Sequence, residues 1–89
     1  MALVLGAQIG DAFLVGRRRV YVSSIDGPTQ ITLTRDDHQN FSIGSEEPTE
    51  VFPDVFIGIG PEPATGRHLR LLFDAPQTIL IIRDRGNSP

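Results

Sequence analysis

The residues best suited to chemistry in this 89-residue chain are its eight basic residues, all arginine, and one short acidic segment that contains a histidine. His38 directly follows Asp36 and Asp37, and these residue types build metal sites and acid–base pairs. Adjacent residues on a strand or turn point in different directions, however, and no second histidine stands at ligand spacing. We therefore expect that the protein is not an enzyme and needs no metal and no cofactor. A hydrolase with a site at His38 would show metal-dependent turnover that His38→Ala abolishes.

Arginine suits contacts with nucleic acid, because its guanidinium group is planar, always charged and able to form paired hydrogen bonds with phosphates and base edges. Residues 1–35 and residues 66–89 each carry four arginines against two aspartates, whereas residues 36–65 carry seven carboxylates and no basic residue. The net charge of −3 argues against nucleic-acid binding, since phosphate neutralisation is a main source of affinity. The two basic ends keep that function open, although an arginine-rich genome would produce the same absence of lysine.

Length and composition limit the class of protein. A chain of 89 residues forms one small domain, and the absence of cysteine excludes disulfides and thiolate metal sites. No apolar run approaches the length of a membrane span, and the N-terminus lacks the basic start and long apolar stretch of a secretion signal. We expect a cytoplasmic protein without membrane contact.

The clearest local pattern lies at residues 66–85. Apolar residues occupy every second position from Leu69 to Phe73, which is the period of a strand. Pro76 then stops that strand, because it has no backbone donor and disfavours helix at the residue before it. A second strand is predicted at residues 78–82, where four branched apolar residues, 79–82, indicate a strand covered on both faces.

Short apolar or alternating runs predict further strands. They lie at residues 3–5, 12–16, 20–22, 30–34, 40–43 and 55–59. The first two, separated by Gly10, indicate a hairpin or a bent pair of strands. Residues 45–54 and 60–66 are expected to be loops, since they are rich in Glu, Pro, Thr and Gly. We predict an all-β fold, a small antiparallel sheet or barrel of short strands with little or no helix.

Residues 66–85 also resemble the carbon storage regulator family, the small bacterial RNA-binding translational regulators of the CsrA and RsmA type. The resemblance rests on a strand, turn and strand with fixed spacing. The matching positions are Gly66, Leu69, Arg70, Leu71, Phe73, Asp74, Ala75, Pro76, Ile79, Ile81 and Arg83. Residues 3–16 resemble the opening segment of the same family, but Gly6, Ala7 and Gln8 stand where that family has Thr-Arg-Arg.

The resemblance implies a bacterial or phage regulator that occupies GGA-containing single-stranded loops in messenger leaders and represses translation, with RNA as its partner. In the family the arginine that matches Arg83 contacts the RNA. The candidate RNA-binding residues are Arg83, Ala75, Pro76, Ile81, Arg70, Arg35, Arg85 and Arg67. The family works as an intertwined homodimer, with the first strand of one chain beside the last strand of the other.

Three alignments of the chain with this family remain open. Two partial copies could occupy residues 1–47 and 48–85. Repetition in general is supported by an offset of 28 residues, which pairs Phe13 with Phe41 and three other apolar or glycine positions with equivalents. A single copy could begin at Leu33, or could carry an insertion at residues 28–65. The protein is accordingly expected to be either a homodimer or a single-chain pseudo-dimer.

An alternative function follows from the departures from the family. The acidic middle, the missing Thr-Arg-Arg segment and the lack of a closing helix favour a protein-interaction or structural module that does not bind RNA. Such a module could be an antagonist of a family regulator or a small β subunit of a larger assembly such as a phage particle. The two functions differ in whether Arg83, Arg35 and Arg70 gather on one surface, away from the carboxylates.

Overall fold

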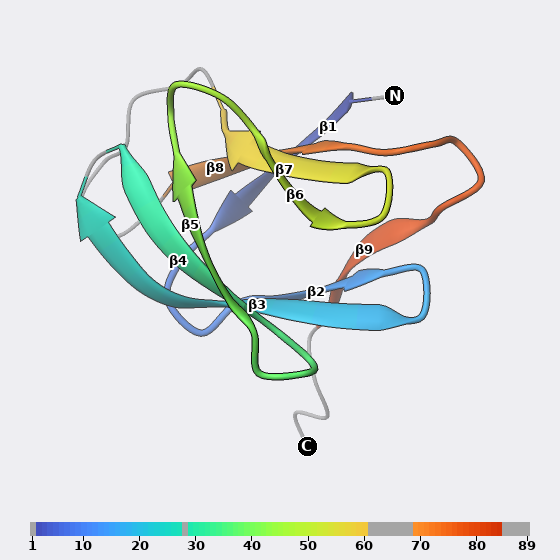
Figure 1. Cartoon of the computed structure of the whole chain (residues 1–89), viewed down its shortest axis with the longest axis horizontal. Coiled ribbons are helices and arrows are strands. Elements are labelled where there is room, and N and C mark those ends of the chain that lie inside the picture. Colours follow the sequence, from blue (N-terminus) through green and yellow to red (C-terminus); the bar gives the residue numbers. More distant parts are fainter. Residues whose placement is uncertain (1, 28, 61–68, 85–89) are drawn as a thin grey trace.

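The computed structural model describes residues 2–27, 29–60 and 69–84. These residues form nine strands and contain no helix, so the predicted all-β class is confirmed (Figure 1). The strands are β1 (Ala2–Ala7), β2 (Ala12–Val15), β3 (Arg18–Gly27), β4 (Gln30–Arg35), β5 (Asn40–Gly44), β6 (Thr49–Phe52), β7 (Val55–Ile59), β8 (Leu69–Asp74) and β9 (Ile81–Asp84). Within the described ranges, no helix is long and apolar enough to cross a membrane.

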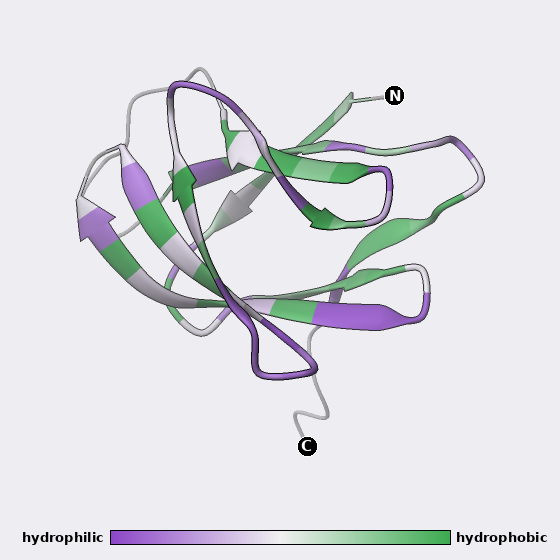
Figure 2. Ribbon diagram, viewed as in Figure 1, coloured by the Kyte–Doolittle hydropathy of each residue, from purple (hydrophilic) through white to green (hydrophobic). Residues whose placement is uncertain are grey.

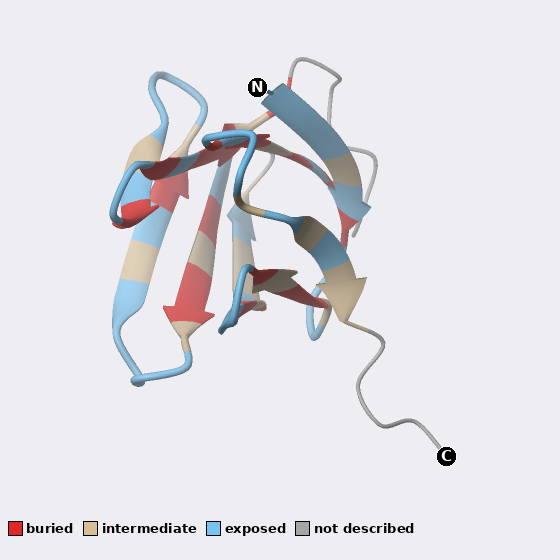
Figure 3. Ribbon diagram, turned by 90° about the vertical axis from the view of Figure 1, so that its right-hand side faces the viewer, coloured by how far each residue is buried: buried red, intermediate tan, exposed pale blue. Residues whose placement is uncertain are grey.

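The strands form two antiparallel sheets. One has four strands in the order β1-β8-β7-β6, and the other has five in the order β5-β4-β3-β2-β9 (Figure 1). The first and last strands of the described chain therefore each lie at the edge of a different sheet. A strand at a sheet edge has one side whose backbone groups are not paired within that sheet. This arrangement places β1 and β9 on the same side of the molecule, where Figure 3 shows them largely exposed or half-buried.

The core lies between the two sheets, where the inward residues of both alternate with outward polar ones. Figure 2 shows this alternation along β3 and β4. Phe13 of β2 and Phe73 of β8 are fully buried, and their ring centroids lie 5.3 Å apart, so this aromatic pair joins the sheets. Ile31 and Leu33 of β4 are also fully buried, so alternate residues of this strand face the core. The other side chains with the least exposure are Ile43, Ile57, Leu71, Val20, Val22, Val51 and Val55.

The strand predicted at residues 78–82 was wrong in position and in burial. Ile79 N donates to Pro76 O at 3.0 Å, so the turn continues and β9 begins only at Ile81. Leu80 is 69% exposed and Ile82 is 45% exposed. The physical reason is that side chains alternate along β9: Ile81 packs against the core, so Ile82 faces out from the two-sheet core, and Leu80 lies in the turn before the strand.

Of the two forms expected for the first two strands, a hairpin or a bent pair, the hairpin is wrong. Strands β1 and β2 lie in different sheets, and the chain crosses between them through Gly10 at φ +93°. Residues 45–54 are not entirely loop, since β6 (Thr49–Phe52) pairs with β7 and buries Val51 and Phe52. Of the loop expected at residues 60–66, all but Gly60 lies outside the described residues.

Candidate nucleic-acid interface

A mostly apolar cleft lies between β1 and the connection from β8 to β9. Its volume is about 260 Å³. It is lined by Leu3, Ala75, Pro76, Gln77, Thr78, Ile79, Leu80 and Ile81. Three of the residues expected to contact RNA, namely Ala75, Pro76 and Ile81, therefore share one cleft.

The shape of the cleft follows from the turn after β8. Ala75 is buried and anchors the start of the turn, whereas Pro76 is exposed at its surface. Beyond the turn, Gly16 N donates to Leu80 O at 2.8 Å, which ties this connection to the β2–β3 turn. Gly16 has φ +62°, a conformation that glycine adopts without steric strain. The cleft wall is thus fixed by backbone hydrogen bonds at two points.

Arg83 lies two residues beyond Ile81 on β9 and points to the same side of that strand. Its Nη1 donates to Asp11 Oδ2 at 3.0 Å and its Nη2 donates to Gly6 O at 2.5 Å. Its guanidinium carbon lies 5.2 Å from the centroid of the Phe13 ring. Arg83 therefore links the edge strand of one sheet to the edge strand of the other, while 31% of its side chain remains exposed.

Arg70 lies close to the same place. In the β1–β8 pairing it stands directly opposite Gly6, whose carbonyl oxygen accepts the hydrogen bond from Arg83. Arg70 is exposed, while its neighbours Leu69 and Leu71 are buried, so its side chain faces out from the four-stranded sheet. Gly6 is thus paired with Arg70 across the two strands and accepts a hydrogen bond from Arg83.

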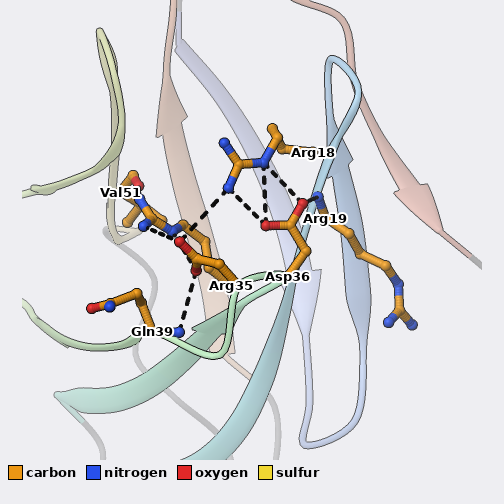
Figure 4. Close-up of polar contacts among 7 residues, drawn as sticks. Arg18, Arg19, Arg35, Asp36, Gln39 and Val51 are labelled. Carbon is orange, nitrogen blue, oxygen red and sulfur yellow. Dashed lines mark hydrogen bonds and ion pairs between the residues drawn. The ribbon is translucent and has the colours of Figure 1, made fainter.

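Arg35 belongs to a different cluster, at the junction of the β4–β5 turn and β6 (Figure 4). It donates to Asp37 at 2.5 Å and to Val51 O at 2.7 Å. Its guanidinium carbon lies 5.0 Å from the centroid of the Phe41 ring and 5.6 Å from that of Phe52. These contacts join the two sheets, so they account for Arg35 by packing and charge pairing.

Charge pairing also explains the acidic segment. Hydrogen bonds from Arg18 are the largest cause that lowers the pKa of Asp36 from 3.8 to about 2. Hydrogen bonds from Arg35 likewise lower the pKa of Asp37, and Asp36 in turn raises the pKa of Arg18. His38 follows at φ 69° in the tight turn, where its backbone N donates to Arg35 O. Across the described part of the chain, no group of three His, Cys, Asp or Glu side chains could hold a metal ion.

The structure thus separates the candidate RNA-binding residues into two places. Ala75, Pro76, Ile81, Arg83 and Arg70 lie around β1 and β9, whereas Arg35 lies beside Asp37 and borders a second hollow with Glu50. The remaining two candidates, at positions 67 and 85, are outside the described residues.

Sequence reasoning missed the partners of Arg83. Asp11 precedes it by 72 residues, and the contact with Gly6 is made through a backbone oxygen. The sequence offered one sign that Asp11 has a structural role, because this carboxylate directly follows the turn glycine Gly10. Nothing in the sequence indicates the hydrogen bond to Gly6, because any residue carries a carbonyl group.

The fold and this cleft define a class, an all-β domain of two sheets with an apolar cleft and arginine side chains beside two edge strands. Comparison of the chain with protein-family models, with curated protein sequences and with solved structures gives no match. An assignment of function therefore depends on the geometry of the cleft and on the residues that surround it.

Proposed function

We propose that this protein is an RNA-binding post-transcriptional regulator. It holds unpaired nucleotides in the cleft between β1 and β9, occupies GGA-containing loops in messenger leaders and thereby represses translation. The observation that carries this proposal is the presence of Ala75, Pro76 and Ile81 in one cleft, with Arg83 two residues beyond Ile81 on the same strand. Sequence-specific recognition of RNA acts mainly on unstacked bases in loops, which proteins contact by stacking and by hydrogen bonds to base edges.

The cleft offers both kinds of contact. Apolar side chains such as Leu3 and Ile81 can cover the flat face of a base. The outer edges of β1 and β9 offer backbone N–H and C=O groups, which can pair with the polar edges of a base. Gln77 and Thr78 add polar side chains at the cleft wall. Recognition of a short unpaired segment therefore fits the cleft better than recognition of a duplex.

The charge distribution limits how RNA is bound. Arg83 and Arg70 stand on either side of Gly6, whereas the acidic residues 36–54 lie on the β4 to β7 part of the chain. Two phosphate contacts on a single strand give a slope of about −1.4 in a plot of log affinity against log salt concentration. Most of the affinity is therefore expected to come from the loop bases.

The test is fluorescence anisotropy with two hairpin RNAs, one with GGA in its loop and one with the loop scrambled, at two salt concentrations. Wild-type protein is expected to prefer the GGA hairpin, and Arg83→Ala to weaken that binding by about tenfold, as loss of a charged hydrogen-bonding group does. Arg35→Gln removes the same charge from the other cluster and is the matched control, with an expected change below about twofold. Equal affinity of the wild type for both hairpins would overturn the proposal.

A second function is favoured by a different observation, the apolar outer face of the four-stranded sheet. Val4 and Phe56 are each 40% exposed there, and half-buried Leu72 lies directly opposite Val4. The outer face of the other sheet carries a polar network in which Ser24 and Thr32 donate to Asp26. If neither hairpin binds, we propose instead that the protein is a protein-interaction module, either an antagonist or a β subunit. The double variant Val4→Ser, Phe56→Ser should then abolish binding of the protein partner without lowering the melting temperature.

A further inference from the structure

The Arg83 side chain is held in place before any ligand arrives. Asp11 accepts one hydrogen bond, Gly6 O accepts a second, and the Phe13 ring lies beneath the guanidinium group. A guanidinium group has five N–H donors. Two of the five are used in these contacts, which leaves three for a ligand, and 31% of the side chain is exposed.

Asp11 is itself fixed by the backbone around it. Its Oδ2 accepts from Gln8 N at 3.1 Å, and its own N donates to Gln8 O at 3.0 Å. Its carbonyl oxygen accepts from Val22 N at 2.9 Å, which attaches the residue to β3. The carboxylate therefore sits on a turn with little freedom and fixes the direction in which Arg83 points.

We propose that Asp11 is a positioning residue for RNA recognition: with Gly6 O it holds the Arg83 guanidinium over Phe13, so that its remaining donors and exposed face meet RNA that extends from the cleft along β9. This inference rests on the proposed RNA-binding function. A long arginine side chain loses rotamer freedom when it binds a ligand. Because Asp11 has already restricted Arg83, that loss does not oppose RNA binding, which is the general advantage of preorganisation.

Simple electrostatics predicts the opposite effect of Asp11. A carboxylate repels phosphate, so removal of its charge would strengthen binding to every RNA alike. A positioning role predicts weaker binding to the GGA hairpin only. The two accounts therefore differ in sign, which makes Asp11 a sharp test.

The experiment compares wild type, Asp11→Asn, Asp11→Glu and the control Glu46→Gln, which removes a carboxylate from the exposed β5–β6 loop. Asparagine keeps an acceptor for Gln8 N but lacks the charge that pairs with Arg83. Anisotropy gives the affinity ratio between the GGA and scrambled hairpins. We expect Asp11→Asn to lower this ratio about fivefold, Asp11→Glu to restore most of it, and Glu46→Gln to leave it unchanged.

A second measurement does not involve RNA. NMR relaxation of the Arg83 Nε–Hε group is expected to show a lower order parameter in Asp11→Asn than in wild type, at unchanged melting temperature. If wild type prefers the GGA hairpin but Asp11→Asn binds it equally well or more tightly, Asp11 only competes with phosphate and this inference is wrong while RNA binding stands. If wild type shows no preference, the proposed function itself fails.

Discussion

Asp36 and Asp37 are adjacent carboxylates whose charges are each compensated by a different arginine, Arg18 and Arg35. The low pKa of Asp36, about 2 in the folded chain against 3.8 for the free group, makes folding depend on pH. A carboxyl group with a lowered folded-state pKa stabilises the protein above its unfolded pKa, and this stabilisation disappears as the pH falls through the folded value. The contribution of Asp36 is thus complete at neutral pH and is lost between about pH 4 and pH 2.

Asp36→Asn should accordingly lower the free energy of unfolding at pH 7 by about 0.5–1 kcal/mol, a small value because partly exposed ion pairs are screened by solvent. At pH 2, where about half of the Asp36 carboxyl groups are protonated in the folded chain, the two proteins should differ much less in their urea midpoints than at pH 7. Urea titrations at both pH values measure this, with Glu46→Gln as the control for loss of a surface carboxylate. An equal difference at pH 7 and pH 2 would show that the effect of Asp36 is not electrostatic.

Backbone conformation at single residues gives a second prediction. His38 lies in the β4–β5 turn with φ 69°, a backbone conformation that is strained for residues other than glycine. His38→Gly should therefore raise the free energy of unfolding by about 0.5–1 kcal/mol. Gly16→Ala is the matched test of opposite sign, because Gly16 has φ +62° and an added Cβ would meet only Ile79 Cγ2 at 3.8 Å. Urea midpoints that move in the same direction for both variants would contradict this account.

At the scale of elements, Arg35 joins β4 to β6 across the two sheets. Its side chain is only 20% exposed, and it contacts Asp37, the Val51 carbonyl and two aromatic rings. Arg35→Gln should lower the free energy of unfolding by about 1–2 kcal/mol, since it leaves the Val51 carbonyl without its charged donor. The same variant should keep the affinity for the GGA hairpin. If Arg35→Gln weakens RNA binding without changing the free energy of unfolding, Arg35 contacts RNA.

The strands themselves were largely predictable, because alternation of apolar residues is a local property. Leu69 to Phe73 and Val55 to Ile59 form strands where the pattern predicted them. The pairing of strands was not predictable, because it depends on contacts between distant residues: β1 pairs with β8 and β2 pairs with β9. Ile82 is exposed because it faces out from the core on β9, and Leu80 because it lies in the turn before that strand, so a run of four apolar residues could not show that either is exposed.

In the candidate site, too, residues close together in the sequence could be predicted, whereas contacts between distant residues could not. Ala75, Pro76, Ile81 and Arg83 could be named from one continuous stretch, and the fold brings the first three into a single cleft. Arg35 could not be separated from them by sequence, because its residue type fits a phosphate contact as well as a bridge between sheets. The role of Asp11 became visible only when the turn after β1 was placed beside β9.

At the scale of the whole molecule, all nine described strands find their pairing partners within one chain. Leu3 of β1 and Ile81 of β9 line the same cleft, so the first and last described strands border it together in one copy of the protein. Because both strands that border the cleft come from one chain, we predict a monomer in solution, although exchange of β1 and β9 between two copies would preserve every pairing.

We therefore expect light scattering to give the mass of one chain, 9.7 kDa, and calorimetric titration to give one GGA hairpin per chain. The reason for the stoichiometry is that, among the described residues, a cleft bordered by both β1 and β9 occurs once.

Arg83→Ala removes the contact with Gly6 O that links the two edge strands, so it should increase any tendency to exchange strands at high concentration. A wild-type mass of about twice the chain would show that the exchanged homodimer is the resting form, because edge strands released by one copy pair readily with another. A trimer or larger ring would contradict both arrangements.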